Sequence, residues 1–287
     1  MRVVVTGASG MIGSTLARVI SRSGAYDVIG VGRRKFADGN PGFHYREFPD
    51  LSSEDAVRHL YADFCPDIVI NCAGLTKHHP SGEDPVEALK TNALLPHFLS
   101  AEAGTRKCRF IHISTDCVFK GDKGHYLETS LLDAEDIYGK SKGFGELIGD
   151  KHLVLRTSTI GHESGTSFGL LEWFLGTAGQ CRGFSNAFFS GLPTIELANL
   201  LITFILPHND LAGLYNIGGK RIDKHSLLRI IADIYGHDIE IIKDPGFVID
   251  RSLDSSKFLN KTGYKAPDWR ELIEKMFADW SARKNDI

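Results

Sequence analysis

The stretch Thr6-Gly7-Ala8-Ser9-Gly10-Met11-Ile12-Gly13 decides the fold, because it joins a buried-strand pattern at residues 3–5 to helical periodicity over residues 12–20. The first glycine permits a tight turn, the second lets backbone approach a phosphate, and the third lets helix pack close to strand. The N-terminus of the helix adds N–H donors for an anion. A plain turn is the alternative. The order strand, glycine turn, helix favours a dinucleotide site formed by Gly7, Ser9, Gly10, Met11, Ile12 and Gly13.

Outward from this turn, short apolar runs alternate with stretches of helical periodicity. Strands are predicted at residues 28–31, 68–70, 110–113 and 153–155. Helices are predicted at residues 56–64, 86–103 and 137–148. Such alternation implies a parallel sheet that is covered on both faces. We therefore predict an α/β, Rossmann-like, doubly wound fold.

The pattern changes after about residue 156. Residues 161–190 are rich in glycine, serine and phenylalanine, and helices are predicted at 193–206, 227–235 and 269–280. A strand at 214–217 could rejoin the sheet. We expect a cofactor domain of residues 1–157, with 193–218 rejoining it, and a smaller, partly interwoven C-terminal α/β substrate lobe of residues 158–192 and 219–287.

Composition narrows the class of protein. The 287 residues are 42% apolar and carry a net charge of -3, so no basic field argues for nucleic acid or an acidic membrane. Five scattered cysteines without a C-x-x-C pair suggest free thiols in a reducing compartment. No signal peptide precedes the first strand, and the apolar run at 200–206 is too short to span a bilayer. A cytoplasmic protein is expected, with a homodimer left open.

Cations follow the second predicted strand, in the sequence Gly32-Arg33-Arg34-Lys35. A domain that grips the ribose of NAD usually places an acid there, whereas a guanidinium suits a 2′-phosphate. A solvated basic loop is the alternative. Arg33 and Arg34 therefore favour NADP(H) over NAD(H).

Tyr138 and Lys142 stand four residues apart on a predicted helix, downstream of Thr115 at the end of a predicted strand. A surface i,i+4 pair is the alternative. The unperturbed pKa of tyrosine is about 10, and a nearby ammonium would lower it. Thr115 can hydrogen-bond a carbonyl oxygen beside the tyrosine. The three residues predict proton transfer to a carbonyl that accepts a hydride.

With these motifs the chain resembles the extended short-chain dehydrogenases/reductases, and within them the dTDP-4-dehydrorhamnose reductase group. The resemblance rests on the glycine turn and on four further stretches, Asn71-Cys72-Ala73-Gly74, residues 114–121, residues 138–142 and residues 191–194. It implies a role in deoxysugar and polysaccharide biosynthesis. It implies catalytic roles for Thr115, Tyr138 and Lys142, with Asp116 near the substrate. It places the cofactor beside Asp50, Leu51, Cys72, Ala73, Gly74 and Asn92, and the substrate beside Thr76, His79, Val118, His162 and Arg251.

Two departures from the family pattern fall where a substrate should bind. Phe188-Phe189 replaces the Asp-Gln that often precedes the Gly-x-Pro-Thr run, and Lys77-His78-His79 replaces small and acidic residues. His78 and His79 lack a third ligand spaced for zinc, so no metal is predicted. His162 could touch substrate or cap a turn. Arg251 could bind a diphosphate or be a surface cation.

The sequence thus predicts an NADPH-dependent reductase of a nucleotide-linked 4-keto-6-deoxysugar. An epimerase of the same superfamily is one alternative. A dehydratase is disfavoured, because Cys117 follows Asp116 where those enzymes carry glutamate. A non-catalytic NADP-binding regulatory subunit, such as that of methionine adenosyltransferase, is the alternative from a different class.

Overall fold

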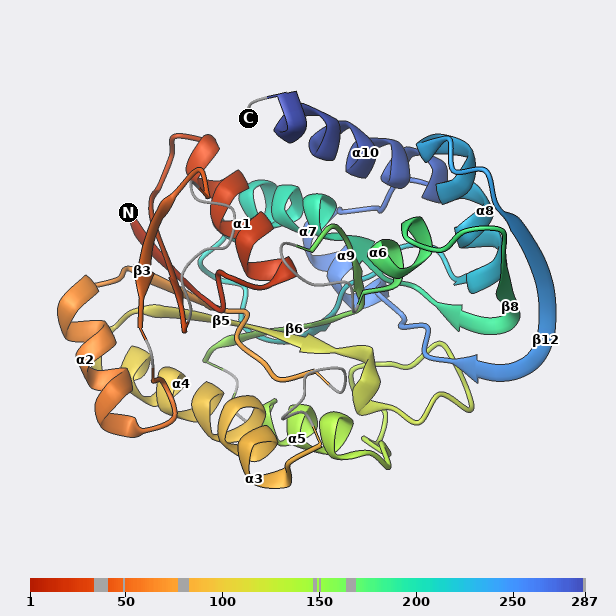
Figure 1. Ribbon diagram of the computed structural model, residues 1–287. Helices are drawn as coiled ribbons and strands as arrows, with labels where there is room; N and C mark the ends of the chain where they lie inside the picture. Colours follow the sequence, from red (N-terminus) through yellow and green to blue (C-terminus); the bar gives the residue numbers. More distant parts are fainter. Residues whose placement is uncertain are drawn as a thin grey trace.

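The computed structural model describes residues 1–33, 41–48, 50–76, 83–146, 149, 151–163 and 169–285. Among these residues, a parallel seven-stranded sheet has the order β10-β6-β5-β4-β1-β2-β3 (Figure 1). Its strands are β1 (Arg2–Thr6), β2 (Asp27–Gly32), β3 (His44–Glu47), β4 (Ile68–Asn71), β5 (Arg109–Thr115), β6 (Leu153–Thr157) and β10 (Gly213–Asn216). The predicted Rossmann-like α/β fold is confirmed. The strand order reverses between β1 and β4, and a crevice forms at such a switch point beyond the carboxyl ends of the strands.

Helices cover both faces of this sheet (Figure 1). One side carries α1 (Met11–Arg22) and α7 (Thr194–Leu200), and the other carries α2 (Glu54–Phe64), α4 (Leu95–Arg106) and α5 (Ile137–Gly145). The apolar residues of β1 show why both faces of the sheet are covered. Val3 and Val5 belong to the apolar cluster that contains Leu16 of α1, whereas Val4 belongs to the cluster that contains Leu60 of α2. Alternate side chains of one strand are buried on opposite faces, so the strand is apolar throughout.

The second half of the chain adds a three-stranded sheet that was not predicted. β8 (Gln180–Phe189) pairs in parallel with β12 (Glu240–Asp250) and antiparallel with β11 (Ile222–Asp223). β8 contains glycine, serine and asparagine, and the register of β12 shifts between Asp244 and Val248, which obscures the two-residue periodicity of both strands. One face of this sheet packs on α8 (Lys224–Tyr235), through Cys181, Phe189 and Leu227.

The remaining elements connect these layers. They are α3 (Pro85–Ala88), the π-helical turn η1 (Leu89–Leu94), the 3-10 turn η2 (Asp116–Val118), β7 (Thr159–Ile160), α6 (Leu170–Leu175), β9 (Leu192–Pro193), the π-helical turn η3 (Leu201–Ile205), α9 (Ser256–Thr262) and α10 (Trp269–Asn285). The strand predicted at 214–217 corresponds to β10, which pairs with β6 at one edge of the large sheet.

A buried ion pair ties several of these elements together. Glu146, just after α5, lies 2.6 Å from Arg156 of β6, and their side chains are only 4% and 1% exposed. Arg156 also donates to Asn216 Oδ1 of β10 at 3.3 Å, and its guanidinium lies over the ring of Phe119. Asn216 Nδ2 in turn donates to the carbonyl of Tyr126. Buried charges require such partners, so the pair fixes the end of α5 against the sheet.

We predict that Arg156→Met lowers the free energy of unfolding by about 3–5 kcal/mol, because it leaves the Glu146 carboxylate buried without its cation. Chemical denaturation followed by circular dichroism measures this. The control is Arg58→Met on α2, whose side chain is 52% exposed and pairs with Glu54 and Asp55. The Arg58→Met substitution should lower the free energy of unfolding by less than about 1 kcal/mol. Equal losses for the two variants would contradict the role given to the buried pair.

Candidate active site

The glycine turn forms a cradle between β1 and α1. Gly7 has φ +69°, and a Cβ there would lie 2.6 Å from the backbone nitrogen of Ala73. A Cβ on Gly13 would lie 2.3 Å from the Gly7 carbonyl oxygen. Gly10 caps α1 without a side chain, and exposed Ser9 precedes it. The two glycines therefore let the turn pack against the backbone after β4 and against the start of α1, where side chains would clash. Exposed Ser9 and Gly10 leave the N-terminus of α1 open, which fits a phosphate there.

The residues predicted at the adenosine end lie beside this turn. Arg33 follows β2 and is exposed, whereas Arg34 and Lys35 fall outside the described residues. Hydrogen bonds from Ser52 lower the pKa of Asp50, and the charges of Lys90 and Arg33 lower it further. Leu51 is buried. Arg33 and Asp50 are thus close enough to interact. Their contact with a cofactor stays a prediction.

Asn92 positions the loop that follows β4. Its Oδ1 accepts from Leu75 N at 2.8 Å, and its Nδ2 donates to Leu75 O and to Ser141 Oγ, both at 3.0 Å. The side chain is fully buried. It therefore clamps the segment containing Cys72, Ala73 and Gly74 to α5, and direct contact of its amide with a cofactor stays a prediction.

Thr115, at the end of β5, and Tyr138, in the first turn of α5, come together as predicted. A side-chain hydrogen bond with Thr115 acts to lower the pKa of Tyr138. Burial of the hydroxyl acts more strongly and raises that pKa well above its usual value, although part of the residue stays exposed. The expectation that Lys142 leaves Tyr138 with a lowered pKa is wrong, because desolvation dominates.

Lys142 is buried beneath the site. Its Nζ donates to the carbonyl of Ile113 at 2.9 Å. Burial lowers the pKa of Lys142 to about 8, while the nearby carboxylate of Glu146 and the thiol of Cys72 act to raise it. The ammonium is still the main form at neutral pH.

Cations from the second half of the chain reach the end of β5. Arg251 donates from Nε to Phe119 O at 2.9 Å, and its Nη1 lies 3.6 Å from Cys117 Sγ. Burial raises the pKa of Asp116, while Arg251 and Lys224 act to lower it. Lys224 was not predicted. It is more than 100 residues from Asp116 in the sequence, and no local motif marks it.

Other predicted substrate residues lie elsewhere. Val118 is fully buried in a cluster with Phe119 and Tyr126, so its side chain serves packing rather than substrate contact, contrary to the expectation. Thr76 is exposed after β4, and His79 lies outside the described residues.

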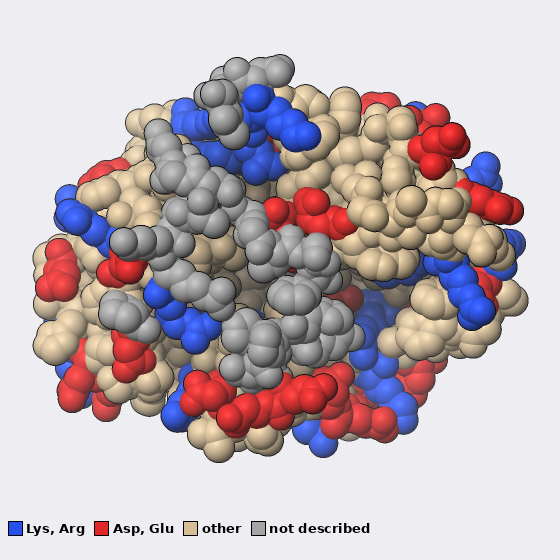
Figure 2. Space-filling view, viewed as in Figure 1, with Lys and Arg blue, Asp and Glu red and all other residues tan. Residues whose placement is uncertain are grey.

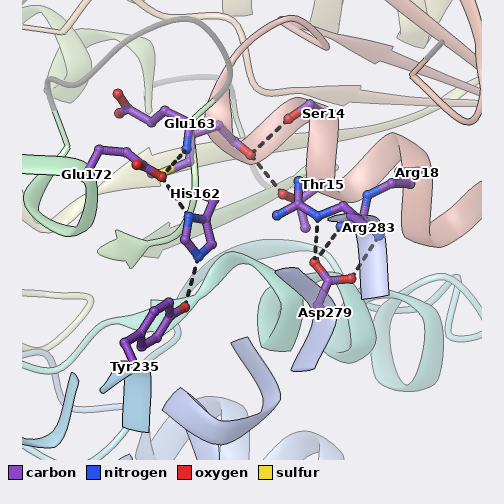
Figure 3. A network of polar contacts seen from close by, with 10 residues as sticks. Ser14, Thr15, Arg18, His162, Glu163, Glu172, Tyr235, Asp279 and Arg283 are labelled. Carbon is purple, nitrogen blue, oxygen red and sulfur yellow. Dashed lines mark hydrogen bonds and ion pairs between the residues drawn. The ribbon is translucent and has the colours of Figure 1, made fainter. Parts of the chain in front are cut away.

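His162 joins a polar network instead of facing a substrate (Figure 3). Its Nδ1 lies 2.7 Å from Glu172 Oε1, and its Nε2 lies 2.9 Å from the Tyr235 hydroxyl. Its ring stacks on Trp280. Because both ring nitrogens contact protein groups, His162 connects the segment after β7 to α6, α8 and α10, and its predicted substrate contact is not supported.

The same view shows how α10 docks on the helix that follows the glycine turn (Figure 3). Arg18 of α1 makes two hydrogen bonds to the carboxylate of Asp279, at 2.8 and 2.7 Å.

Within the described ranges, no group of three or more His, Cys, Asp or Glu side chains could hold a metal ion. The helices in those ranges are also too short or too polar to cross a membrane.

Residues 1–181 match the family described as RmlD substrate binding domain. This extended dehydrogenase/reductase class fits the parallel sheet, the glycine cradle and the Thr115/Tyr138 pair. The chain belongs to this family, and the resemblance predicted from its motifs is confirmed.

Three relatives illustrate the range of names in the family. The chain is 27% identical to spore coat polysaccharide biosynthesis protein SpsK of Bacillus subtilis, over 98% of both chains. It is 30% identical to dTDP-4-dehydrorhamnose reductase of Aggregatibacter actinomycetemcomitans, over 58% of this chain and 54% of the relative. It is 31% identical to methionine adenosyltransferase 2 subunit beta of Rattus norvegicus, over 50% of this chain and 41% of the relative. The match thus spans about half the length of the last two.

A solved structure shows the same fold. The crystal structure of dTDP-4-dehydrorhamnose reductase from Bacillus anthracis, in complex with NADP, superposes with a TM-score of 0.80 and 20% identity. The match covers 97% of this chain and 99% of that one. The two proteins therefore share their fold over almost their whole length.

We predict that Lys142 titrates near pH 8, because burial lowers its pKa to about 8 from the usual 10.5. The unfolded chain binds this proton more tightly, so the contribution of Lys142 to stability rises as pH increases from about 8 to about 10.5. NMR of protein labelled with 13C in lysine side chains measures the midpoint, with Lys142→Met to assign the signal. Glu146→Gln should lower the midpoint further. A midpoint near the usual value would contradict the buried position.

Proposed function

We propose that the chain is an NADPH-dependent reductase of a nucleotide-linked 4-keto-6-deoxysugar. The observation that carries this proposal is the placement of three groups at the carboxyl ends of the parallel strands. The glycine cradle lies beyond β1, the Thr115/Tyr138 pair lies between β5 and α5, and cations of the second lobe approach Asp116. The names of the reductase relatives support the same substrate class.

The cradle and its surroundings suit a bound dinucleotide. Backbone around Gly7 and Gly13 would receive the pyrophosphate, and exposed Arg33 would meet a 2′-phosphate. When bound, NADPH supplies a hydride to the keto carbon, which leaves NADP⁺ and an alkoxide oxygen that takes up one proton.

Tyr138 provides that proton. Its phenol is protonated at neutral pH, because the unperturbed pKa of tyrosine is already about 10 and burial raises it further, so Tyr138 can give a proton to the oxygen as charge develops there. Thr115 orients the oxygen through its hydroxyl. Lys142, with its ammonium fixed at the Ile113 carbonyl, supplies positive charge under the site and holds the cofactor ribose.

The two halves of the chain bind different molecules, one the cofactor and the other the substrate. Residues 1–157, together with 193–218, form the cofactor domain, and residues 158–192 and 219–287 form the substrate lobe. The cofactor's pyrophosphate occupies the glycine turn, so the substrate's diphosphate needs a different set of donors. Arg251 and Lys224 are suitably placed cations of the substrate lobe, because both act on the buried Asp116 next to Thr115.

NADPH oxidation assayed against a panel of nucleotide 4-keto-6-deoxysugars, with identification of the product, tests the proposal. A reductase consumes one NADPH for each alcohol formed. Sugar conversion without net NADPH consumption would indicate an epimerase. A chain that binds NADP, converts no sugar and retains a protein partner in a pull-down would be a regulatory subunit, as the similarity to methionine adenosyltransferase 2 subunit beta allows.

Replacing Tyr138 with phenylalanine keeps the ring and removes the acid. We expect kcat to fall by about 10²-fold or more, with little change in cofactor affinity. Tyr26→Phe is the matched control, because Tyr26 precedes β2 at the amino ends of the parallel strands, whereas Thr115 ends β5 at their carboxyl ends. If Tyr138→Phe turned over substrate as fast as this control, the catalytic assignment would be lost.

Replacing Arg33 and Arg34 together with alanine should weaken NADPH binding far more than NADH binding. Each lost phosphate contact should cost about 1–3 kcal/mol, as for other charge-assisted hydrogen bonds. Dissociation constants for both cofactors measure the difference, with Arg58→Ala on α2 as a control. Equal weakening of NADPH and NADH, or a native preference for NADH, would refute the proposed choice of cofactor.

A further inference from the structure

A cleft lies between the segment Lys120–Asp122, shortly after Thr115, and strands β8 and β12 of the three-stranded sheet. It measures about 420 Å³, within the range of about 300–1,000 Å³ of small-molecule sites. One wall is the segment Lys120–Asp122, and the floor includes Asn186 and Phe188 of β8 and Asp250 at the end of β12. Arg251, which follows Asp250, donates to the Phe119 carbonyl and lies 3.6 Å from Cys117 Sγ, so the end of β12 connects the cleft to the segment that follows Thr115. On this side of the molecule, Figure 2 shows cationic side chains gathered in a hollow between the two lobes.

The floor of the cleft belongs to the face of β8 that points away from α8. Cys181, Gly183, Ala187 and Phe189 of this strand are buried, whereas the alternate residues Phe184, Asn186 and Phe188 are partly exposed. Side chains alternate between the two faces of a strand, so Phe188 lies on the open face of the three-stranded sheet.

Arg221 forms a rigid, flat layer over Phe188. Its guanidinium carbon lies 3.3 Å from the centroid of the Phe188 ring. Its Nε donates to Asp250 Oδ2 at 2.7 Å. Asp250 is itself held, because its Oδ1 accepts from Ser252 N at 2.9 Å. One face of the guanidinium is therefore covered by phenylalanine, while the side chain remains 37% exposed and lines the cleft.

The charges around the cleft favour a neutral planar group over a phosphate. Its lining carries two cations, Lys120 and Arg221, and two carboxylates, Asp122 and Asp250. A dianionic phosphate would need an excess of positive charge. A planar guanidinium, by contrast, stacks well on the face of an aromatic ring, and base stacking tolerates different bases because each has a π-face.

We propose that this cleft binds the nucleobase of the nucleotide-linked substrate. The base stacks on the guanidinium of Arg221, which itself stacks on the ring of Phe188. The inference rests on the proposed function, because it assigns a subsite to that substrate. This subsite would explain the aromatic side chain of Phe188, at a position where related chains often carry aspartate. With the base on Arg221, the diphosphate lies toward Arg251, and the sugar lies toward Tyr138.

Calorimetric titration of the NADP⁺-saturated protein tests this subsite, with dTDP and inorganic pyrophosphate as probes. Arg221→Lys keeps the charge but loses the plane, and Phe188→Leu removes the aromatic support. Each should weaken dTDP binding by at least about fivefold, as expected for loss of base stacking, and should leave pyrophosphate binding unchanged. The controls are Arg182→Lys and Phe184→Leu, on the same face of β8 and outside the cleft lining. Both should bind dTDP like the wild type.

Unchanged dTDP affinity in both variants would overturn the subsite. An equal loss of dTDP and pyrophosphate affinity would also overturn it, because it would show a phosphate site. Failure of wild-type protein to bind dTDP, UDP or GDP would do the same. The proposed reductase activity is judged separately. Turnover of a keto sugar by variants with unchanged dTDP affinity would refute only the subsite. A base-dependent loss of affinity in a chain that reduces no sugar would refute only the reductase.

Discussion

The buried ion pair between Glu146 and Arg156 is the constraint on which the rest of the structure depends. Two opposite charges that are almost completely removed from water must stay together, because either one alone would be costly. Arg156 lies on β6, between β5 and β10, so the pair fixes the end of α5 against the sheet, and α5 carries Tyr138 and Lys142. Asn216 extends the same network to β10 and to the Tyr126 carbonyl. A single carboxylate thus serves both the fold and the site, because Glu146 also acts to raise the pKa of Lys142.

Chemically different groups lie at the carboxyl ends of the parallel strands. Glycine at positions 7 and 13 lets the turn beyond β1 pack against neighbouring backbone, whereas the segment at the end of β5 carries hydroxyl groups and a buried carboxyl group. The second lobe adds cations to this carboxyl group through Arg251 and Lys224. In the proposed function, different halves of the chain bind the diphosphate of the cofactor and that of the substrate. Residues from both halves of the chain therefore build the proposed reductase site.

The parts of this arrangement that depend on local sequence could be predicted. The glycine turn, the buried strands and the helical pair Tyr138 and Lys142 could be predicted, because each has a residue spacing typical of its local structure. β8 and β12 could not be found, because their alternation is interrupted by small residues and by the shift in register. The polar network of His162 could not be predicted, for a different reason. Its partners Glu172, Tyr235 and Trp280 come from three separate helices, and only tertiary packing brings them together. Lys224 and Arg221 were not predicted for the same reason, because only tertiary packing brings them to their partners.

Transfer of a labelled hydride tests the central claim most directly. Protein given NADPH with deuterium on the transferable position of the nicotinamide, and a nucleotide 4-keto-6-deoxysugar, should yield an alcohol that carries one deuterium on the former keto carbon. Mass spectrometry and NMR of the product locate the label. A product whose carbon gains no deuterium, or a chain that releases no reduced sugar at all, would contradict the account.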